Sequence, residues 1–244
     1  MKWKRLACAI VIASLFSAGG LDGSAGGFAG TLVRAQSAPP AKAASADTLP
    51  PVIPIFPLEE ALLFPGIARP LYIFEPRYRA MVADALKGDR IIGMTTLKPG
   101  YEANYQGRPP VYPIGCAGLI TDVQELPDGR FTIVLHGLVK FRVTSEDESR
   151  PYRLARVEAL PEVLTDGDKA ALSKQRERLE ALITKGSDAK VPPGMPDEGL
   201  VNMVAQYLPL DSDGDRQTLL ELKNVLLRSQ ALIDLIEKKL APAK

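Results

Sequence analysis

The stretch VIPIFPLEEALLFPGIARPLYIFEPRYRAMVADALKGDR, residues 52–90, predicts two short strands followed by one amphipathic helix. The first strand is expected at residues 52–56, and its internal Pro54 favours a position at a sheet edge. The second strand is expected at Arg69–Phe74. The helix begins at Pro76, because a missing backbone N–H costs nothing in the first turn. Its apolar face repeats at helical spacing through Tyr78, Met81, Val82, Ala85 and Leu86.

Two motifs in this stretch, and three segments further along the chain, carry a family resemblance. The motifs are Leu63-Phe64-Pro65-Gly66 and Phe74-Glu75-Pro76-Arg77-Tyr78-Arg79. The later segments are residues 114–120, 137–143 and Pro151-Tyr152. Together they resemble the amino-terminal, substrate-binding domain of Lon protease over about residues 52–240. The candidate site residues, with a structural or a recognition role left open, are Phe64, Pro65, Gly66, Phe74, Glu75, Pro76, Arg77 and Tyr78.

The resemblance implies a fold and a function. The fold is α+β: a distorted antiparallel β-barrel of PUA-like type with one inserted helix, followed by a carboxy-terminal helical bundle. The family region helps the protease to choose substrates and contains no catalytic residues. In the full protease an ATPase module and a Ser-Lys peptidase follow it. The chain ends at Lys244, so we expect a non-catalytic module and no enzyme.

The residues themselves predict the same order of strands and then helices. Strands are expected at Ile91–Leu97 and Tyr152–Leu160, and Pro127-Asp128-Gly129 predicts a hairpin turn between Cys116–Leu126 and Arg130–Val143. Gly137 inside the second hairpin strand predicts a bulge or a tight bend. Helices are expected at Asp168–Thr184, Glu198–Leu208 and Asp215–Leu240. The last helix has an apolar stripe that docks either another chain or its own domain.

The predicted boundaries divide the chain into four parts. Residues 1–35 have a basic start and an apolar run of signal-peptide length, and residues 36–51 have the composition of a disordered linker. Residues 52–161 form the β-rich subdomain and residues 162–244 the helical one, with 52–240 as one LON domain. We expect export to the periplasm or medium, without a stable membrane span. The alternatives are an uncleaved anchor, or a cytoplasmic protein with a misassigned start.

The sequence contains no residue pattern typical of a catalytic, metal or cofactor site. His136 is the sole histidine and is expected to be a structural or surface strand residue. Cys116 has apolar neighbours and is expected to be a buried thiol. Residues 211–215, DSDGD, begin like a calcium loop but lack its later glycine and glutamate, so helix capping explains them better. Glu59-Glu60 is expected in a solvated turn. We expect no cofactor and no metal.

The expected partners follow from charge and from one loop. A formal net charge of +1 without a basic run argues against nucleic acid. Unfolded or partner protein segments, held by a strand edge or an apolar groove, are the expected ligands. The alternative is a small-molecule-binding or enzymatic role. It points to the loop Lys98–Pro113, with Tyr101, Tyr105 and Tyr112, which either binds a ligand or packs back on the body.

Overall fold

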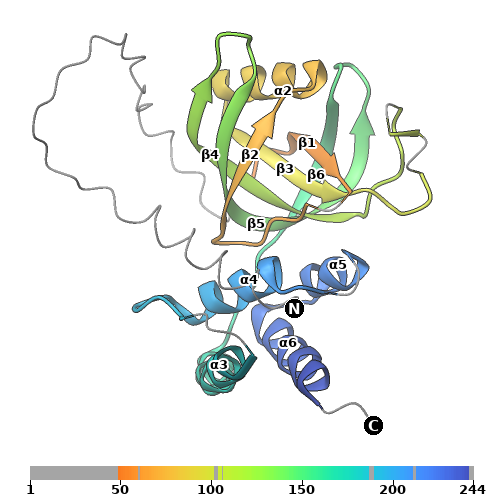
Figure 1. The fold of residues 1–244 in the computed structure, drawn as a ribbon. Coiled ribbons are helices and arrows are strands. Elements are labelled where there is room, and N and C mark those ends of the chain that lie inside the picture. Colours follow the sequence, from red (N-terminus) through yellow and green to blue (C-terminus); the bar gives the residue numbers. More distant parts are fainter. Residues whose placement is uncertain are drawn as a thin grey trace, which may run out of the picture.

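The computed structural model describes residues 49–59, 61–101, 104–105, 107–186, 190–210 and 213–241. The predicted signal peptide lies outside the described residues, as does the predicted linker up to residue 48. The described chain places a six-stranded sheet above a group of helices, with one further helix on the sheet (Figure 1). The predicted α+β fold class is confirmed.

All six strands belong to one sheet, in the order β2-β5-β4-β3-β1-β6. Their bounds are β1 Val52–Leu58, β2 Ala68–Ile73, β3 Ile91–Thr96, β4 Ile114–Glu125, β5 Phe131–Asp147 and β6 Arg153–Leu160. The long strand β5 pairs with β2 along its first half and with β6 along its second half. Because β6 also pairs with β1, the pairings close into a ring, and β2 stands outside it at the edge.

The sheet is mixed, which corrects the prediction of a purely antiparallel barrel. β1 and β3 run parallel, with Ile55 opposite Gly93. Parallel neighbours need a long crossover connection. The chain between them contains β2 and helix α2, Pro76–Lys87, which is long enough for that crossover. The result is a distorted mixed sheet whose pairings close on themselves, with β2 outside the ring, and not a clean barrel.

Helix α2 packs on the sheet through its apolar face (Figure 1). Pro76 occupies its first turn, as expected. Tyr78, Met81, Val82 and Ala85 are buried. The Tyr78 ring lies 4.4 Å from the Phe56 ring, centroid to centroid. The spacing that predicts the helix is therefore also the spacing that anchors it.

Four helices follow the sheet: α3 Asp166–Gly186, α4 Asp197–Tyr207, α5 Asp213–Glu221 and α6 Val225–Leu240. The prediction of a single long helix at Asp215–Leu240 is wrong, because the helix is interrupted between Glu221 and Val225. Asn224 caps α6, and its side chain accepts a hydrogen bond from the Leu227 N–H at 3.0 Å. Asparagine is a favoured helix N-cap, so the break has a local cause.

One hydrophobic core joins the sheet to the helices. It includes Phe56 and Ile133 from the strands, Leu179 from α3, Met203 from α4 and Ile236 from α6. The apolar stripe of the last predicted helix belongs to this core, since Leu219 and Ile236 are 2% and 0% exposed. The stripe therefore packs against its own domain, as one of the two interpretations proposed.

Candidate functional site

The turn motif Phe64-Pro65-Gly66 lies between the sheet and helix α4. Phe64 is fully buried, and its backbone N–H donates to the Gln206 side chain at 3.1 Å. The Pro65 carbonyl accepts from the Asn202 amide at 2.9 Å. Gly66 has φ +75°, a backbone conformation that glycine adopts without strain. These contacts give the first motif a structural role, as the point where the helices attach to the sheet.

The turn packs against Gly137 on β5 through backbone hydrogen bonds. The Gly66 N–H donates to the Gly137 carbonyl at 2.8 Å, and the Gly137 N–H donates to the Ile67 carbonyl at 2.9 Å. A Cβ atom at Gly137 would lie 2.1 Å from the Phe64 carbonyl oxygen. The register between β4 and β5 also shifts here, which confirms the predicted bulge. Glycine is needed because another backbone passes at contact distance.

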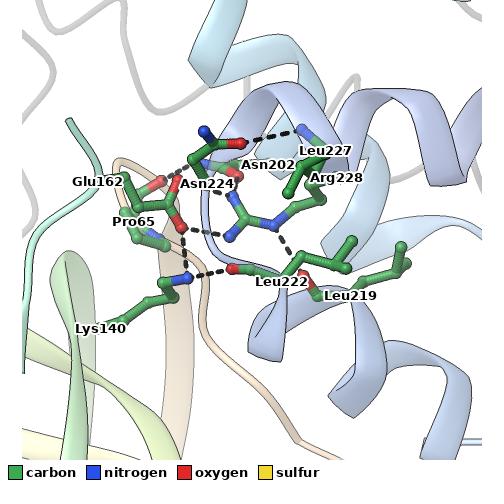
Figure 2. Close-up of polar contacts among 9 residues, drawn as sticks. All are labelled: Pro65, Lys140, Glu162, Asn202, Leu219, Leu222, Asn224, Leu227 and Arg228. Carbon is green, nitrogen blue, oxygen red and sulfur yellow. Dashed lines mark hydrogen bonds and ion pairs between the residues drawn. The ribbon is translucent and has the colours of Figure 1, made fainter. Parts of the chain in front are cut away.

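Four polar side chains form a buried ion cluster next to the turn, which Figure 2 shows: Lys140, Glu162, Asn202 and Arg228. Lys140 Nζ lies 2.8 Å from Glu162 Oε1 and also donates to the Leu222 carbonyl. The Arg228 guanidinium is fully buried and is paired with Glu162. It donates to the Asn202 side-chain oxygen at 2.6 Å and to the Leu219 carbonyl at 3.0 Å.

The cluster holds two cations against one carboxylate. Burial lowers the pKa of Lys140, and Glu162 opposes that shift only in part. Arg228 also lies 5.4 Å from the Phe64 ring centroid, within cation–π range. A buried charge is tolerated only when it is paired and hydrogen-bonded. The cluster therefore ties β5, α4, α5 and α6 together through charge and hydrogen bonds.

The second motif, Phe74-Glu75-Pro76-Arg77-Tyr78, lies where β2 meets α2. Glu75 precedes the helix, and its carboxylate accepts from Arg77 Nε at 3.0 Å and from the Tyr105 hydroxyl at 2.8 Å. The Arg77 guanidinium lies 4.6 Å from the Tyr78 ring centroid and 4.9 Å from the Tyr105 ring centroid. Burial raises the pKa of the Tyr78 hydroxyl. Most of this motif thus holds the junction between strand and helix.

Phe74 is the exception within the motif. Its side chain is 59% exposed, and its ring lies 6.1 Å from the half-exposed Tyr72 ring. Side chains alternate along a strand, and the exposed members of β2 are Ala68, Pro70 and Tyr72. We name Ala68, Pro70, Tyr72 and Phe74 the outer stripe. An apolar outward face is unusual, because half-buried strands present polar residues to water.

The outer stripe lies on the edge strand of the sheet. β2 pairs with β5, and among the described strands it has no second neighbour. Polar groups rim the stripe: Thr132 and His136 lie opposite Tyr72 and Ala68, and the Arg130 guanidinium lies 5.3 Å from the Tyr72 ring centroid. An apolar patch with a polar rim is typical of a protein-binding surface.

The loop Lys98–Pro113, called the tyrosine loop below, meets the second motif at a cleft of about 230 Å³. Tyr105 packs back on the body against Arg77, whereas Tyr101 is 47% exposed. The cleft is lined mainly by the start of α2, by Tyr105 and residues 107–109 of the loop, and by residues 151–153 at the start of β6, with Pro57 and Leu97 completing it. The loop therefore does both things that the sequence left open, since it packs on the body and also forms one wall of a cleft.

The remaining candidates give no reactive site. His136 is a half-buried strand residue, and burial lowers its pKa. Cys116 is fully buried, as predicted, and burial raises the pKa of its thiol. Glu59 is exposed, and Glu60 and residues 211–212 lie outside the described residues. Within the described ranges no group of three His, Cys, Asp or Glu side chains could hold a metal.

Comparisons with known proteins explain the two motifs together. A family model described as the ATP-dependent protease La (LON) substrate-binding domain matches residues 52–238. The chain belongs to this family. The resemblance that the two motifs suggested is thereby confirmed. The match is to the substrate-binding domain of Lon and not to its protease domain.

Relatives of this LON substrate-binding domain are full Lon proteases. The Lon protease of Cytophaga hutchinsonii is 25% identical over 205 residues, which cover 79% of this chain and 25% of that protein. Lon protease 2 of Myxococcus xanthus is 31% identical over 134 residues, which cover 55% of this chain and 16% of that protein. The chain thus spans about a quarter of the length of the Cytophaga relative.

Solved structures show the same fold. The amino-terminal domain of Mycobacterium avium complex Lon protease has a TM-score of 0.57 at 18% identity, and the match covers 78% of this chain and 100% of that chain. The Lon N-terminal domain protein from Xanthomonas campestris has a TM-score of 0.51 at 23% identity, covering 75% and 97%. At these identities the likeness concerns the fold alone.

Sequence reasoning on this LON domain did not find the ion cluster or the outer stripe. Glu162 follows the last strand in a segment without a motif, and Arg228 interrupts the apolar pattern of α6. That interruption was the available signal, because a charge on a buried helix face needs a partner. The sequence also contained a signal for the outer stripe. Residues 68–74 are all apolar except Arg69, so both faces of this strand carry apolar side chains.

Proposed function

We propose that this protein is a non-catalytic module that binds extended, apolar segments of partner proteins along the outer stripe. The observation that carries the proposal is the exposed apolar row of Ala68, Pro70, Tyr72 and Phe74 on an edge strand. An extended peptide adds to such an edge through backbone hydrogen bonds and through side-chain contacts at alternate positions. The family description, a substrate-binding domain, supports a protein partner.

Aromatic side chains suit this role for a physical reason. Tyr72 and Phe74 offer large apolar area with few rotatable bonds, so ordering them on binding costs little entropy. Burial of the exposed parts of both rings against a partner removes apolar surface from water, which contributes favourable binding free energy. Arg130 lies next to the Tyr72 ring and is already paired with Asp128, so the rim is polar without an excess of positive charge. Pro70 lacks an N–H, so a strand added at this edge loses one backbone hydrogen bond there and depends more on the side-chain contacts of the outer stripe.

The test measures binding of dye-labelled, permanently unfolded casein by fluorescence anisotropy. Tyr72→Ser combined with Phe74→Ser is expected to weaken binding by at least about tenfold, since hot-spot truncations at interfaces exceed about 2 kcal/mol. The melting temperature should change little, because both side chains are exposed. The matched control is Leu227→Ser, a 49% exposed apolar residue on α6. Equal binding by the double variant, or no binding by the unchanged protein, would contradict the proposal.

No helix in the described part of the chain is long and apolar enough to cross a membrane. We also propose that the protein is exported through the signal-like segment of residues 1–35, on the strength of its basic start and apolar run. Cell fractionation followed by mass spectrometry of the amino terminus tests this. A mature start at Gln36 or near Gly20 outside the cytosol is the expected result. An intact Met1 in the cytosol would contradict export.

A further inference from the structure

The cleft between α2, the tyrosine loop and β6 has a lining that the outer stripe does not explain. Three of its lining residues are arginines, Arg77, Arg108 and Arg153, and among the residues that the structure describes no acidic side chain lines it. Three others are tyrosines, Tyr78, Tyr105 and Tyr152. A concave site that combines aromatic walls with convergent cations is suited to an anion attached to an apolar group.

Two of the three tyrosine hydroxyls already donate hydrogen bonds to carboxylates of the protein. The Tyr105 hydroxyl donates to Glu75 at 2.8 Å, and the Tyr152 hydroxyl donates to Asp84 at 2.9 Å. The Tyr78 ring is covered on one side by the Arg77 guanidinium, 4.6 Å from its centroid. The rings therefore act as apolar walls, and the guanidinium groups supply the polar contacts.

The three arginines differ in how firmly they are held. Arg153 makes two bonds of 2.6 Å to Glu146 and a third of 2.6 Å to the Pro109 carbonyl. Arg77 is paired with Glu75 at 3.0 Å. Both guanidinium groups thus already have close carboxylate partners and serve to shape the cleft.

Arg108 is held less firmly. It donates to the carbonyls of Asp147 and Arg150 at 3.4 and 3.2 Å, the long end of the hydrogen-bond range. Its nearest carboxylate, Glu148, lies 3.9 Å away, and the Glu148 side chain is 78% exposed. An exposed ion pair of this kind contributes little to stability. A ligand carboxylate can replace Glu148 at small cost and pair with the planar guanidinium through two parallel bonds.

We infer that this cleft binds a carboxylate carried on a short aromatic or apolar group, with Arg108 as the anchor. The volume of about 230 Å³ is below the range of about 300–1,000 Å³ typical of pockets for drug-sized ligands. A free small acid and the terminal residue of a peptide share this chemistry and this size. The site is separate from the outer stripe and does not depend on the proposed function.

The experiment uses the full chain and calorimetric titration with four probes: phenylacetate, N-acetyl-Gly-Phe with a free carboxylate, the same dipeptide amidated, and inorganic phosphate. At least one acid is expected to bind, and the amide to bind at least about tenfold more weakly, since the amide loses the charge-assisted hydrogen bonds to the guanidinium. Tighter binding of phenylacetate identifies a small acid as the ligand class, and tighter binding of the dipeptide identifies a chain end. Either result supports the site.

Variants locate the binding. Arg108→Gln should weaken acid binding by at least about tenfold, and Arg108→Lys by less, because lysine keeps the charge but not the planar fork. The matched control is Arg178→Gln, an exposed arginine on α3 that pairs with Glu237. The Tyr72→Ser, Phe74→Ser double variant should still bind the acid, which separates this test from that of the stripe.

Three results would overturn the inference. They are equal binding of acid and amide, unchanged acid binding by Arg108→Gln in a protein that melts normally, and tighter binding of inorganic phosphate than of either acid.

Discussion

Phe74 and Tyr78 belong to the same sequence motif but lie in opposite environments. Phe74 is 59% exposed, and Tyr78 is 4% exposed against Phe56. The difference follows from position, since Phe74 ends a strand face that points to water, whereas Tyr78 lies on the buried face of α2. At the residue scale the motif thus has two roles, one in packing and one at the surface.

Gly137 gives the clearest prediction at this scale. Gly137→Ala should lower the free energy of unfolding by about 1–3 kcal/mol or more, because the new methyl group would meet the Phe64 carbonyl oxygen at 2.1 Å. The control is Gly167→Ala in the first turn of α3, where the nearest atom is 3.8 Å away. That change should raise stability by about 0.4–1 kcal/mol. Urea unfolding measures both, and equal effects would contradict the account of Gly137.

At the scale of elements, hydrogen bonds and ion pairs connect the helices to the sheet in addition to apolar packing. The turn 64–66 is bonded to α4 through Gln206 and Asn202. The ion cluster fastens β5 to the break between α5 and α6 through Lys140 and Arg228. Helix α2 is linked to the start of β6 through Asp84 and Tyr152.

The unequal charge of the ion cluster gives a prediction about two variants. Glu162→Gln leaves Lys140 and Arg228 buried without a carboxylate and should cost about 3–5 kcal/mol of stability. Lys140→Met leaves one cation with one carboxylate and should cost about 1 kcal/mol, the net worth of one hydrogen bond. Urea unfolding at neutral pH gives both values. A larger loss for Lys140→Met would show that the lysine, and not the charge balance, holds the joint.

The link between α2 and β6 predicts a pH dependence. The hydrogen bond from Tyr152 lowers the pKa of Asp84 in the folded protein. A lowered carboxylate pKa stabilises the folded state above the unfolded value of about 3.9, and this stabilisation is lost as the pH falls through the lower folded value. Asp84→Asn should therefore be less stable than the unchanged protein at pH 7, with a difference that shrinks below about pH 4.

Tyr152→Phe serves as the control for this pH effect. It removes the donor and keeps the ring, so it should weaken the same dependence in part, because Lys87 and Arg150 also lie near Asp84. Urea midpoints between pH 7 and acid conditions give the comparison. A constant difference between Asp84→Asn and the unchanged protein at every pH would rule out the assigned link.

At the scale of the whole molecule, most buried apolar residues of the strands and helices belong to one shared core, and a second cluster that includes Ile55, Val139 and Phe141 lies within the sheet. Core residues such as Phe64 contact the sheet side and the helix side at once. Two units with a continuous apolar core are expected to unfold together. The sheet therefore depends on the helices for stability as well as for its position.

Thermal unfolding should show a single transition. Six of the seven tyrosines lie in the sheet part, so near-UV circular dichroism reports mainly on the sheet. Far-UV circular dichroism reports mainly on the helices. The two melting curves should coincide within error. A lower melting midpoint for the helices would mean that the ion cluster and the shared core do not couple the unfolding of the sheet to that of the helices.

Sequence patterns were enough to predict the α+β order of elements, the family, the start of α2 at Pro76, the bulge at Gly137 and the burial of Cys116. These follow from local spacing, from turn and cap chemistry, and from motifs that are contiguous along the chain. The tertiary structure alone decided the parallel pairing of β1 and β3, the ion cluster around Arg228, the exposure of Phe74 and the arginine-lined cleft. Each of these joins residues far apart in sequence, and no local pattern records which distant segment a strand, a charge or a loop will meet.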